Sequence, residues 1–278
     1  MNPRFTRLNA RFPHRRAFIT GASSGLGLEL ARQLAGDGWT LGLFDRNLER
    51  LTSVEAELAE AGVKLVAYPG DVTQADELTV AVNSFAATHD GLDVMINNAG
   101  VAGAGSMMEV SLEDWRWIID INLMGVVHGS RAAIPHLQRN GSGLLINVAS
   151  AAAFASAPGM ISYNATKAAV VSISETLVNE LRPVGIQVSV VMPTFFRSSL
   201  LETLRGPEHA RLRANEAMER SDYPVEQAAR DLLTASADGQ TYIVLPKAAR
   251  MLWRMKRWMP LRFLAQVRNF TQRQPSTP

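Results

Sequence analysis

The chain has 278 residues and no cysteine, which excludes disulfide bonds, thiolate metal sites and a cysteine nucleophile. Hydrophobic residues make up 47% and charged residues 19%, as expected of a globular protein with a sizeable core. No apolar run approaches the roughly 20 residues that span a bilayer, and no secretory signal is recognisable, so we expect a cytoplasmic protein.

The net charge of +2 is unevenly distributed. No acidic residue follows Asp238, whereas eight basic residues do. At the other end, five arginines between Arg4 and Arg16 precede the first apolar run. They predict a solvated basic arm, with an organellar transit segment as the alternative.

Strands and helices alternate along the chain. In chain order, apolar runs and apolar residues at helical spacing predict strand 17–20, helix 26–34, strand 39–44, helix 48–61, strand 63–68, helix 73–88, strand 92–96, helix 112–138 with a bend near Pro135, strand 143–148, helix 161–181, strand 186–192, helix 225–235 and strand 241–245. Short strands that are apolar on both faces favour a doubly wound parallel sheet, the Rossmann fold, of about seven strands with helices on both faces.

No repeat or linker divides this pattern, so we expect one dinucleotide-binding and catalytic domain over 1–247 and a C-terminal extension over 248–278. A polar helical segment at 195–223 interrupts the alternation after the sixth strand. Ligands of such sheets bind beyond the carboxyl ends of the strands. The segment therefore predicts a lid over the ligand site.

The first strand runs into a glycine-punctuated turn, TGASSGLG at 20–27. Glycine lets a backbone turn tightly and approach a pyrophosphate, and the following helix offers its N-terminal N–H groups to the anion. A merely structural turn is the alternative. The predicted pyrophosphate contacts are Gly21, Ser23, Ser24, Gly25, Leu26 and Gly27.

Two adjacent charges at the end of the second strand bear on the choice of dinucleotide. A carboxylate at Asp45 can accept hydrogen bonds from the ribose hydroxyls of NAD and repels a 2′-phosphate. The guanidinium of Arg46 can pair with that phosphate and would favour NADP. Because Asp45 stands directly at the strand end, we predict NAD, with NADP as the alternative.

Two further strand ends carry candidate residues. Asp71 and Val72 follow the third strand, and Asn98, Ala99 and Gly100 follow the fourth, where small residues leave room for a ribose or an adenine. Ordinary turn chemistry is the alternative for all five. No arrangement of candidate ligands predicts a metal site.

Ser150 follows the fifth strand, and Tyr163 and Lys167 lie four residues apart on one face of the next helix. A lysine cation one turn away favours the phenolate, which predicts a lowered pKa for Tyr163 and a role in passing a proton to or from a substrate oxygen. A surface helix pair is the alternative for such a spacing.

Together, TGASSGLG at 20–27, NNAG at 97–100, Asn122, Ser150 and YNATK at 163–167 resemble the short-chain dehydrogenase/reductase family over about residues 14–247. The resemblance implies an NAD(P)-dependent oxidoreductase that moves a hydride between a nicotinamide cofactor and a small-molecule alcohol or carbonyl. It also implies a homodimer or homotetramer built on the helices at 112–138 and 161–181.

The resemblance assigns roles to individual residues. Tyr163 would be the general acid or base, and Lys167 would bind the nicotinamide ribose and lower the pKa of Tyr163. Ser150 would hold the substrate oxygen, and Asn122 would keep a water in a proton relay. Among the cofactor contacts, Asp71 and Val72 would flank the adenine and Asn98 would lie near the adenosine ribose.

The sixth strand ends in a departure from the family pattern. Where the family has Pro-Gly followed by a threonine, this chain has Pro193-Thr194 followed by Ser198. We expect Pro193 and Ser198 to keep their contacts with the cofactor. Phe195 and Phe196 make the pocket wall more apolar or, as we expect for at least one of them, pack the lid.

The C-terminal extension reads as an amphipathic helix interrupted at Pro260. Its apolar positions are Met251, Leu252, Met255, Trp258, Met259, Phe263, Leu264, Val267 and Phe270. We expect it to pack on the pocket rim or a subunit interface; peripheral contact of 248–270 with an anionic membrane is the alternative. No nucleic-acid motif accompanies the basic residues, so we expect no nucleic-acid partner.

The prediction for function is an active dehydrogenase or reductase for a fairly apolar alcohol or carbonyl substrate. The alternative is a catalytically silent dinucleotide-binding sensor or scaffold, because a fold does not guarantee activity.

Overall fold

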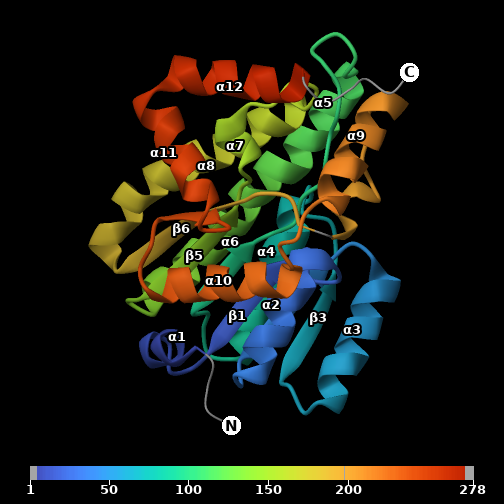
Figure 1. The fold of residues 1–278 in the computed structure, drawn as a ribbon. Helices are drawn as coiled ribbons and strands as arrows, with labels where there is room; N and C mark the ends of the chain where they lie inside the picture. Colours follow the sequence, from blue (N-terminus) through green and yellow to red (C-terminus); the bar gives the residue numbers. More distant parts are fainter. Residues whose placement is uncertain (1–4, 197, 273–278) are drawn as a thin grey trace.

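The computed structural model describes residues 5–196 and 198–272, and it contains a seven-stranded sheet in the order β3-β2-β1-β4-β5-β6-β7 (Figure 1). All neighbouring strands are parallel. The sheet grows outward in opposite directions from β1 and β4, so a crevice opens between their carboxyl ends. The strands are β1 (Arg16–Thr20), β2 (Thr40–Asp45), β3 (Leu65–Pro69), β4 (Val94–Asn97), β5 (Gly143–Val148), β6 (Ile186–Pro193) and β7 (Tyr242–Leu245).

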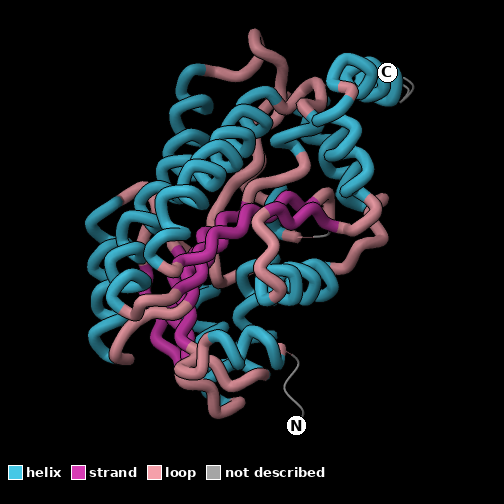
Figure 2. Tube along the Cα trace, turned by 90° about the vertical axis from the view of Figure 1, so that its left-hand side faces the viewer, coloured by secondary structure: helices cyan, strands magenta, loops and turns pink. Residues whose placement is uncertain are grey.

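Helices cover both faces of the sheet, so that Figure 2 shows the strands between two helical layers. One layer contains α2 (Gly25–Gly36), α3 (Leu48–Glu60) and α10 (Val225–Ala237). The other contains α4 (Ala75–Thr88), α5 (Leu112–Ile119), α6 (Gly125–Arg139) and α8 (Ile161–Leu181). The architecture is the doubly wound Rossmann-like fold that the strand pattern predicts.

The apolar residues of the strands divide between these layers. Leu41 and Ile96 pack with Leu34 on the face of α2 and α10, whereas Phe18 and Met95 pack with Phe85 on the face of α4 and α6. Because side chains alternate between the faces of a strand, strands covered on both sides are mostly apolar on both faces. This explains why apolar residues predominate along the strands.

The long helix predicted at 112–138 is irregular at a different place from the one expected. The helix continues through Pro135, and instead a π-helical turn, η1 (Asp120–Met124), separates α5 from α6. Asn122 lies in this turn, and its side chain bonds both the N–H and the carbonyl of Val101, at 2.8 and 2.9 Å. These two bonds hold the turn against the segment after β4.

The N-terminal segment is not the solvated arm that its arginines predict. It forms α1 (Thr6–Arg11), with Phe5, Leu8 and Phe12 buried in the same cluster as α2 and α10. Asn9 accepts a hydrogen bond of 2.8 Å from the indole of Trp39. The apolar residues at helical spacing, rather than the charges, decide the position of this segment; Arg4 lies outside the described residues.

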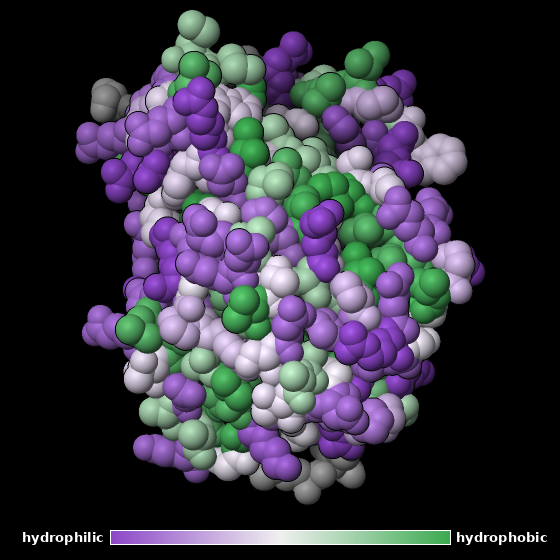
Figure 3. Space-filling model, turned by 180° about the vertical axis from the view of Figure 1, so that it is seen from behind, coloured by the Kyte–Doolittle hydropathy of each residue, from purple (hydrophilic) through white to green (hydrophobic). Residues whose placement is uncertain are grey.

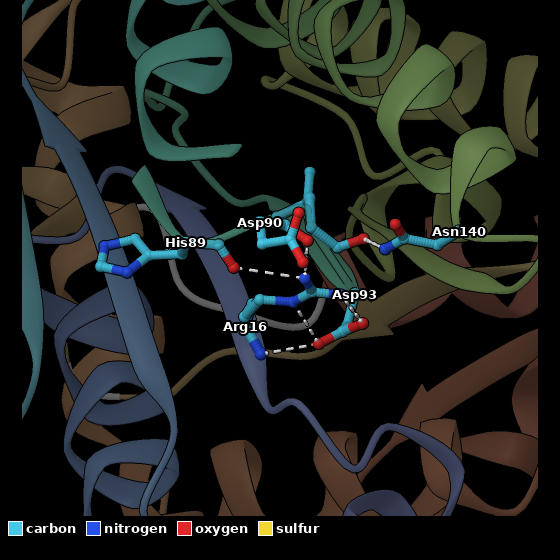
Figure 4. A network of polar contacts seen from close by, with 6 residues as sticks. Arg16, His89, Asp90, Asp93 and Asn140 are labelled. Carbon is cyan, nitrogen blue, oxygen red and sulfur yellow. Dashed lines mark hydrogen bonds and ion pairs between the residues drawn. The ribbon is translucent and has the colours of Figure 1, made fainter. Parts of the chain in front are cut away.

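A buried ion pair ties β1 to β4 at the amino-terminal edge of the sheet (Figure 4). Arg16 donates to both carboxylate oxygens of Asp93, from Nε at 3.0 Å and from Nη2 at 2.8 Å. Its third nitrogen donates to the carbonyls of His89 and Asp90. These contacts join the ends of β1 and β4 at this edge, and the opposite edge holds the cleft described below.

The C-terminal extension forms two helices, α11 (Ala249–Trp258) and α12 (Pro260–Gln272), that lie over the carboxyl edge of the sheet (Figure 1). They pack through a third cluster in which Phe263, 3% exposed, meets Phe154 of the short helix α7 (Ala152–Ala155) at 6.4 Å between ring centres. The expectation that the extension packs on the pocket rim is therefore met. Among the described residues no helix is both long and apolar enough to cross a membrane.

Candidate active site

The carboxyl ends of the strands open into one cleft of about 1350 Å³. The cleft is lined by every predicted site residue except Gly27 and Asn122, which lie directly behind its wall. The predicted residues that line it are Gly21, Ser23, Ser24, Gly25, Leu26, Asp45, Arg46, Asp71, Val72, Asn98, Ala99, Gly100, Ser150, Tyr163, Lys167, Pro193 and Ser198.

Where the backbone of the glycine turn most closely approaches neighbouring atoms, only glycine fits. Gly21 and Gly25 have positive φ angles of 63° and 52°, and a Cβ on Gly21 would lie 2.8 Å from the Cα of Ala99. A Cβ on Gly27 would overlap the carbonyl oxygen of Gly21, so this glycine allows α2 to pack against the turn. The result is a cradle of backbone at the N-terminus of α2, which fits the pyrophosphate of a dinucleotide.

Asn98 fastens this turn to the end of β4. Its side-chain amide donates to the carbonyls of Thr20 and Gly21 at 2.9 and 3.1 Å, and its backbone N–H donates to the hydroxyl of Thr20 at 3.0 Å. The amide nitrogen is thus used to hold the turn in shape, while the residue still lines the cleft.

Asp45 also contacts the glycine turn. One carboxylate oxygen accepts from the backbone N–H of Ser23 at 3.0 Å, and the other accepts from that of Asn47 at 2.9 Å. Each oxygen keeps a further lone pair, so the carboxylate can still receive ribose hydroxyls. Arg46 stands beside it, exposed at the same end of the cleft.

Asp71 and Val72 form the wall beside the end of β3. The side chain of Asp71 accepts from the N–H of Thr73 at 2.9 Å, and its own N–H donates to Glu77 at the same distance. Val72 is 8% exposed, which makes this stretch an apolar surface for a flat ring.

Tyr163 lies in the first turn of α8 and is 6% exposed. Burial raises the pKa of Tyr163 to about 12, and the hydrogen bond with the Ser150 hydroxyl acts in the opposite direction. The sequence predicts a pKa lowered by Lys167; here the loss of solvation outweighs the neighbouring groups. Ser150 is held by the N–H of Ala152, which donates to its hydroxyl at 3.1 Å.

Lys167 is buried one helical turn further along α8. Its Nζ donates to the carbonyl of Val148 at 2.9 Å and lies 5.7 Å from the centre of the Tyr163 ring. Burial lowers the pKa of Lys167 to about 8. The ammonium ion therefore loses its proton only slightly above neutral pH.

Asn122 lies behind this pair and is fully buried. A Cβ on Gly100 would lie 3.1 Å from the Oδ1 of Asn122 and 3.3 Å from the Nζ of Lys167. Gly100 therefore occupies the narrow space between these two polar groups, and a larger residue would separate them.

The segment after β6 crosses the glycine turn. A Cβ on Gly25 would lie 3.4 Å from the Cβ of Ser198. The segment is linked to α3 by an ion pair of 2.8 Å between Arg50 and Glu202. A second ion pair, of 3.2 Å, links Arg205 to Asp114 on α5. The segment after β6 then continues into α9 (Glu208–Glu219), whose inner face lines the cleft.

The far half of the cleft contains residues that the motifs do not identify. Apolar side chains from α7, α9, α11 and α12 and from the start of α8 line it beyond Ser150 and Tyr163, namely Phe154, Ala155, Met160, Ala210, Ala214, Met218, Leu252, Phe263 and Val267. Their helical spacing predicts buried faces but does not say which surface each face meets. Among the residues that the structure describes, no three His, Asp or Glu side chains converge as a metal site would require.

A doubly wound sheet with this glycine turn and a buried tyrosine–lysine pair defines the class of NAD(P)-dependent oxidoreductases. The model of the short chain dehydrogenase family matches residues 15–209, and the chain belongs to this family.

Three known proteins illustrate the similarity. A 3-oxoacyl-(acyl-carrier-protein) reductase of Staphylococcus aureus strain Mu50 is 33% identical over 68% of this chain and 77% of its own length. A short-chain dehydrogenase/reductase from Burkholderia phymatum in complex with NAD has a TM-score of 0.83 and 28% identity, over 95% of this chain and 97% of its own. One from Sphingobium yanoikuyae in complex with NADPH has a TM-score of 0.74 and 29% identity, over 89% and 94%.

Proposed function

We propose that this protein is an active oxidoreductase that interconverts an apolar alcohol and its carbonyl compound, with Tyr163 as general acid and base. The observation that carries the proposal is the position of the Tyr163 hydroxyl. It is buried, bonded to Ser150, and placed in the cleft that also contains the glycine turn.

In this proposal a bound nicotinamide dinucleotide supplies or accepts the hydride. The glycine turn would hold its pyrophosphate at the N-terminus of α2, and Asp71 and Val72 would border its adenine. Lys167 would bind the nicotinamide ribose, and Ser198 and Pro193 would contact the nicotinamide end. Ala99 and Gly100 leave room between these contacts.

The proton moves at the other side of the reacting carbon. Ser150 donates a hydrogen bond to the substrate oxygen and so fixes it beside the Tyr163 hydroxyl. In reduction, Tyr163 gives its proton to that oxygen as the carbon–oxygen double bond is reduced; in oxidation, its phenolate takes the proton back. A pKa of about 12 keeps Tyr163 protonated at neutral pH, which suits the reductive direction.

Lys167 and Asn122 support this step. The Lys167 ammonium stabilises negative charge on the Tyr163 oxygen after proton transfer. Asn122 is fixed by its bonds to both backbone groups of Val101, and in this proposal it would keep a water that links Lys167 to solvent.

For the cofactor we propose NAD. The Asp45 carboxylate lies at the ribose end of the cleft and would meet a 2′-phosphate as a like charge. Arg46 is the residue through which NADP would bind, and solved relatives carry either dinucleotide.

The lining of the far half supports an apolar substrate. Side chains from α7, α9, α11 and α12 offer carbon atoms around the position beyond Ser150. The name of the staphylococcal relative, a reductase of 3-oxoacyl groups, agrees with a carbonyl carried by an apolar chain. In domain terms, we propose a catalytic unit over 1–247, a lid over 195–223 and a substrate wall contributed by the extension.

The proposal is tested by comparing Tyr163→Phe with the wild type in fluorescence titrations of NADH and NADPH and in turnover of apolar ketones. We expect turnover to fall by roughly 10²–10⁴-fold while NADH affinity is unchanged. Tyr242→Phe, outside the cleft, is the control and should keep both properties. Unchanged turnover in Tyr163→Phe would refute the acid–base role. Binding of NADH and NADPH without any turnover would identify a silent dinucleotide sensor, and tighter binding of NADPH would refute the choice of NAD.

A further inference from the structure

The corner between α11 and α12 is an exposed apolar projection. Four consecutive residues, Trp258, Met259, Pro260 and Leu261, are exposed there, with Trp258 at 84% and Leu261 at 81%. We call residues 258–261 the apolar corner. Figure 1 shows the turn between the two helices at the outer edge of the molecule.

This exposure is not explained by the packing of the extension. Ala249 and Trp253 form the inner side of α11, and Phe263 and Val267 form that of α12, so both helices already have a buried face. Met251, 73% exposed, lies seven residues before Trp258 and therefore extends the apolar surface along the outer side of α11. An exposed tryptophan beside exposed methionine and leucine is unusual on a surface that meets only water.

Cations surround the apolar corner. Arg254 precedes it by about one turn, and Arg257 and Arg262 flank it directly. Arg257 lies 4.0 Å from the carboxylate of Glu175 on α8. No acidic residue follows Asp238 in the sequence, so the extension itself contributes only positive charge to this surface.

We propose that the apolar corner and its flanking arginines dock the protein on an anionic lipid surface. Tryptophan and leucine at a helix corner can enter the boundary between headgroups and acyl chains, while arginines reach the phosphates. A second copy of the chain is a poorer occupant, because a twofold contact would bring the same arginines together. A nucleic acid would neutralise the arginines but would leave the apolar corner in water.

The extension that carries the apolar corner also contributes to the wall of the cleft. Leu252 of α11 lines the cleft and is also 44% exposed, so the extension forms part of both the pocket wall and the outer surface. A protein docked through the apolar corner would have one wall of its apolar pocket close to the lipid.

The test is flotation of the full-length protein with vesicles of phosphatidylcholine alone or with added phosphatidylglycerol. We expect the wild type to float only with anionic vesicles and to be released by salt, because surface charges are screened within roughly 10 Å at 0.1 M ionic strength. Trp258→Ser/Leu261→Ser should lose binding. Arg254→Gln/Arg262→Gln should weaken the partition constant by about fivefold for each cation removed. The matched control is Val80→Ser/Leu212→Ser, which removes exposed apolar side chains from α4 and α9.

Four outcomes would overturn the proposal. They are no flotation of the wild type, equal flotation with neutral vesicles, undiminished flotation of Trp258→Ser/Leu261→Ser, and equal loss in the control variant. Light scattering of the same samples measures oligomer size and so tests the alternative that the apolar corner contacts a second copy of the chain. If Trp258→Ser/Leu261→Ser changes the oligomer size without affecting flotation, the corner belongs to a contact between copies of the chain.

Discussion

Burial changes the two titrating groups of the site in opposite directions. It raises the pKa of Tyr163 to about 12 and lowers that of Lys167 to about 8, because each charged form loses solvation. The site therefore contains a phenol and an ammonium ion at neutral pH, and the ammonium is the group that titrates first as pH rises. The sequence identifies both residues by their spacing, but the extent of burial depends on surrounding segments that no local motif describes.

This order predicts the pH dependence of carbonyl reduction. We expect kcat/KM to stay level up to about pH 8 and to fall above it, as Lys167 loses the charge that stabilises the Tyr163 oxygen. Tyr163 remains protonated over this range. A pH profile from 6 to 10, with circular dichroism to verify folding at each pH, measures the effect. A flat profile up to pH 10 would contradict the assignment.

At the scale of elements, the periodic apolar pattern predicts all seven strands and the helices that connect them. The pattern does not predict local structure that depends on tertiary contacts. Asn122 is found by resemblance to a family motif, yet the π-helical turn that contains it depends on Val101, which is 21 residues away in sequence. The arginines at the N-terminus predict a solvated arm, whereas the segment forms a helix because Phe5, Leu8 and Phe12 are buried against the domain.

The connection between β1 and β4 gives a prediction at this scale. Arg16→Met leaves Asp93 as an uncompensated buried charge, so we expect the free energy of unfolding to fall by about 3–5 kcal/mol. The control is Arg32→Met, which removes the exposed ion pair of 2.7 Å with Glu57. That variant should lose at most about 1 kcal/mol. Urea unfolding of both variants measures the difference, and equal losses would show that the buried pair has no special role.

For the whole molecule, the sequence predicts the layers but not the cleft. The glycine turn and the tyrosine–lysine pair mark its near half, since glycine and titratable side chains have recognisable chemistry. The far half is built from apolar residues of α7, α9 and the extension, which are separate segments distributed between Phe154 and Val267 in the sequence. Apolar side chains of this kind predict burial but do not specify the surface on which they pack.

The helices α5, α6 and α8 carry the prediction for assembly. Figure 3 shows hydrophobic side chains gathered on the face opposite to that of Figure 1, and Met124 in η1 is 36% exposed. We expect a dimer or tetramer that buries the helices 112–138 and 161–181 of each copy. Met124→Glu should shift the mass measured by light scattering toward the monomer, whereas Val80→Glu on α4 should not. A wild-type monomer at micromolar concentration would contradict the prediction.

The segment from Ser198 to α9 contacts both ends of the cleft, and thermodynamic linkage gives this a consequence. The segment approaches the glycine turn at Gly25 and lines the far half of the cleft through Ala214 and Met218. If the binding of one ligand orders this segment, the second ligand binds without that cost in free energy. Each ligand should therefore increase the affinity for the other by the same factor. Calorimetric titration of an unreactive substrate analogue, with and without NAD, would measure that factor. We expect the analogue to bind more tightly when the dinucleotide is bound. The proposed lid would then determine the order in which the dinucleotide and the substrate bind.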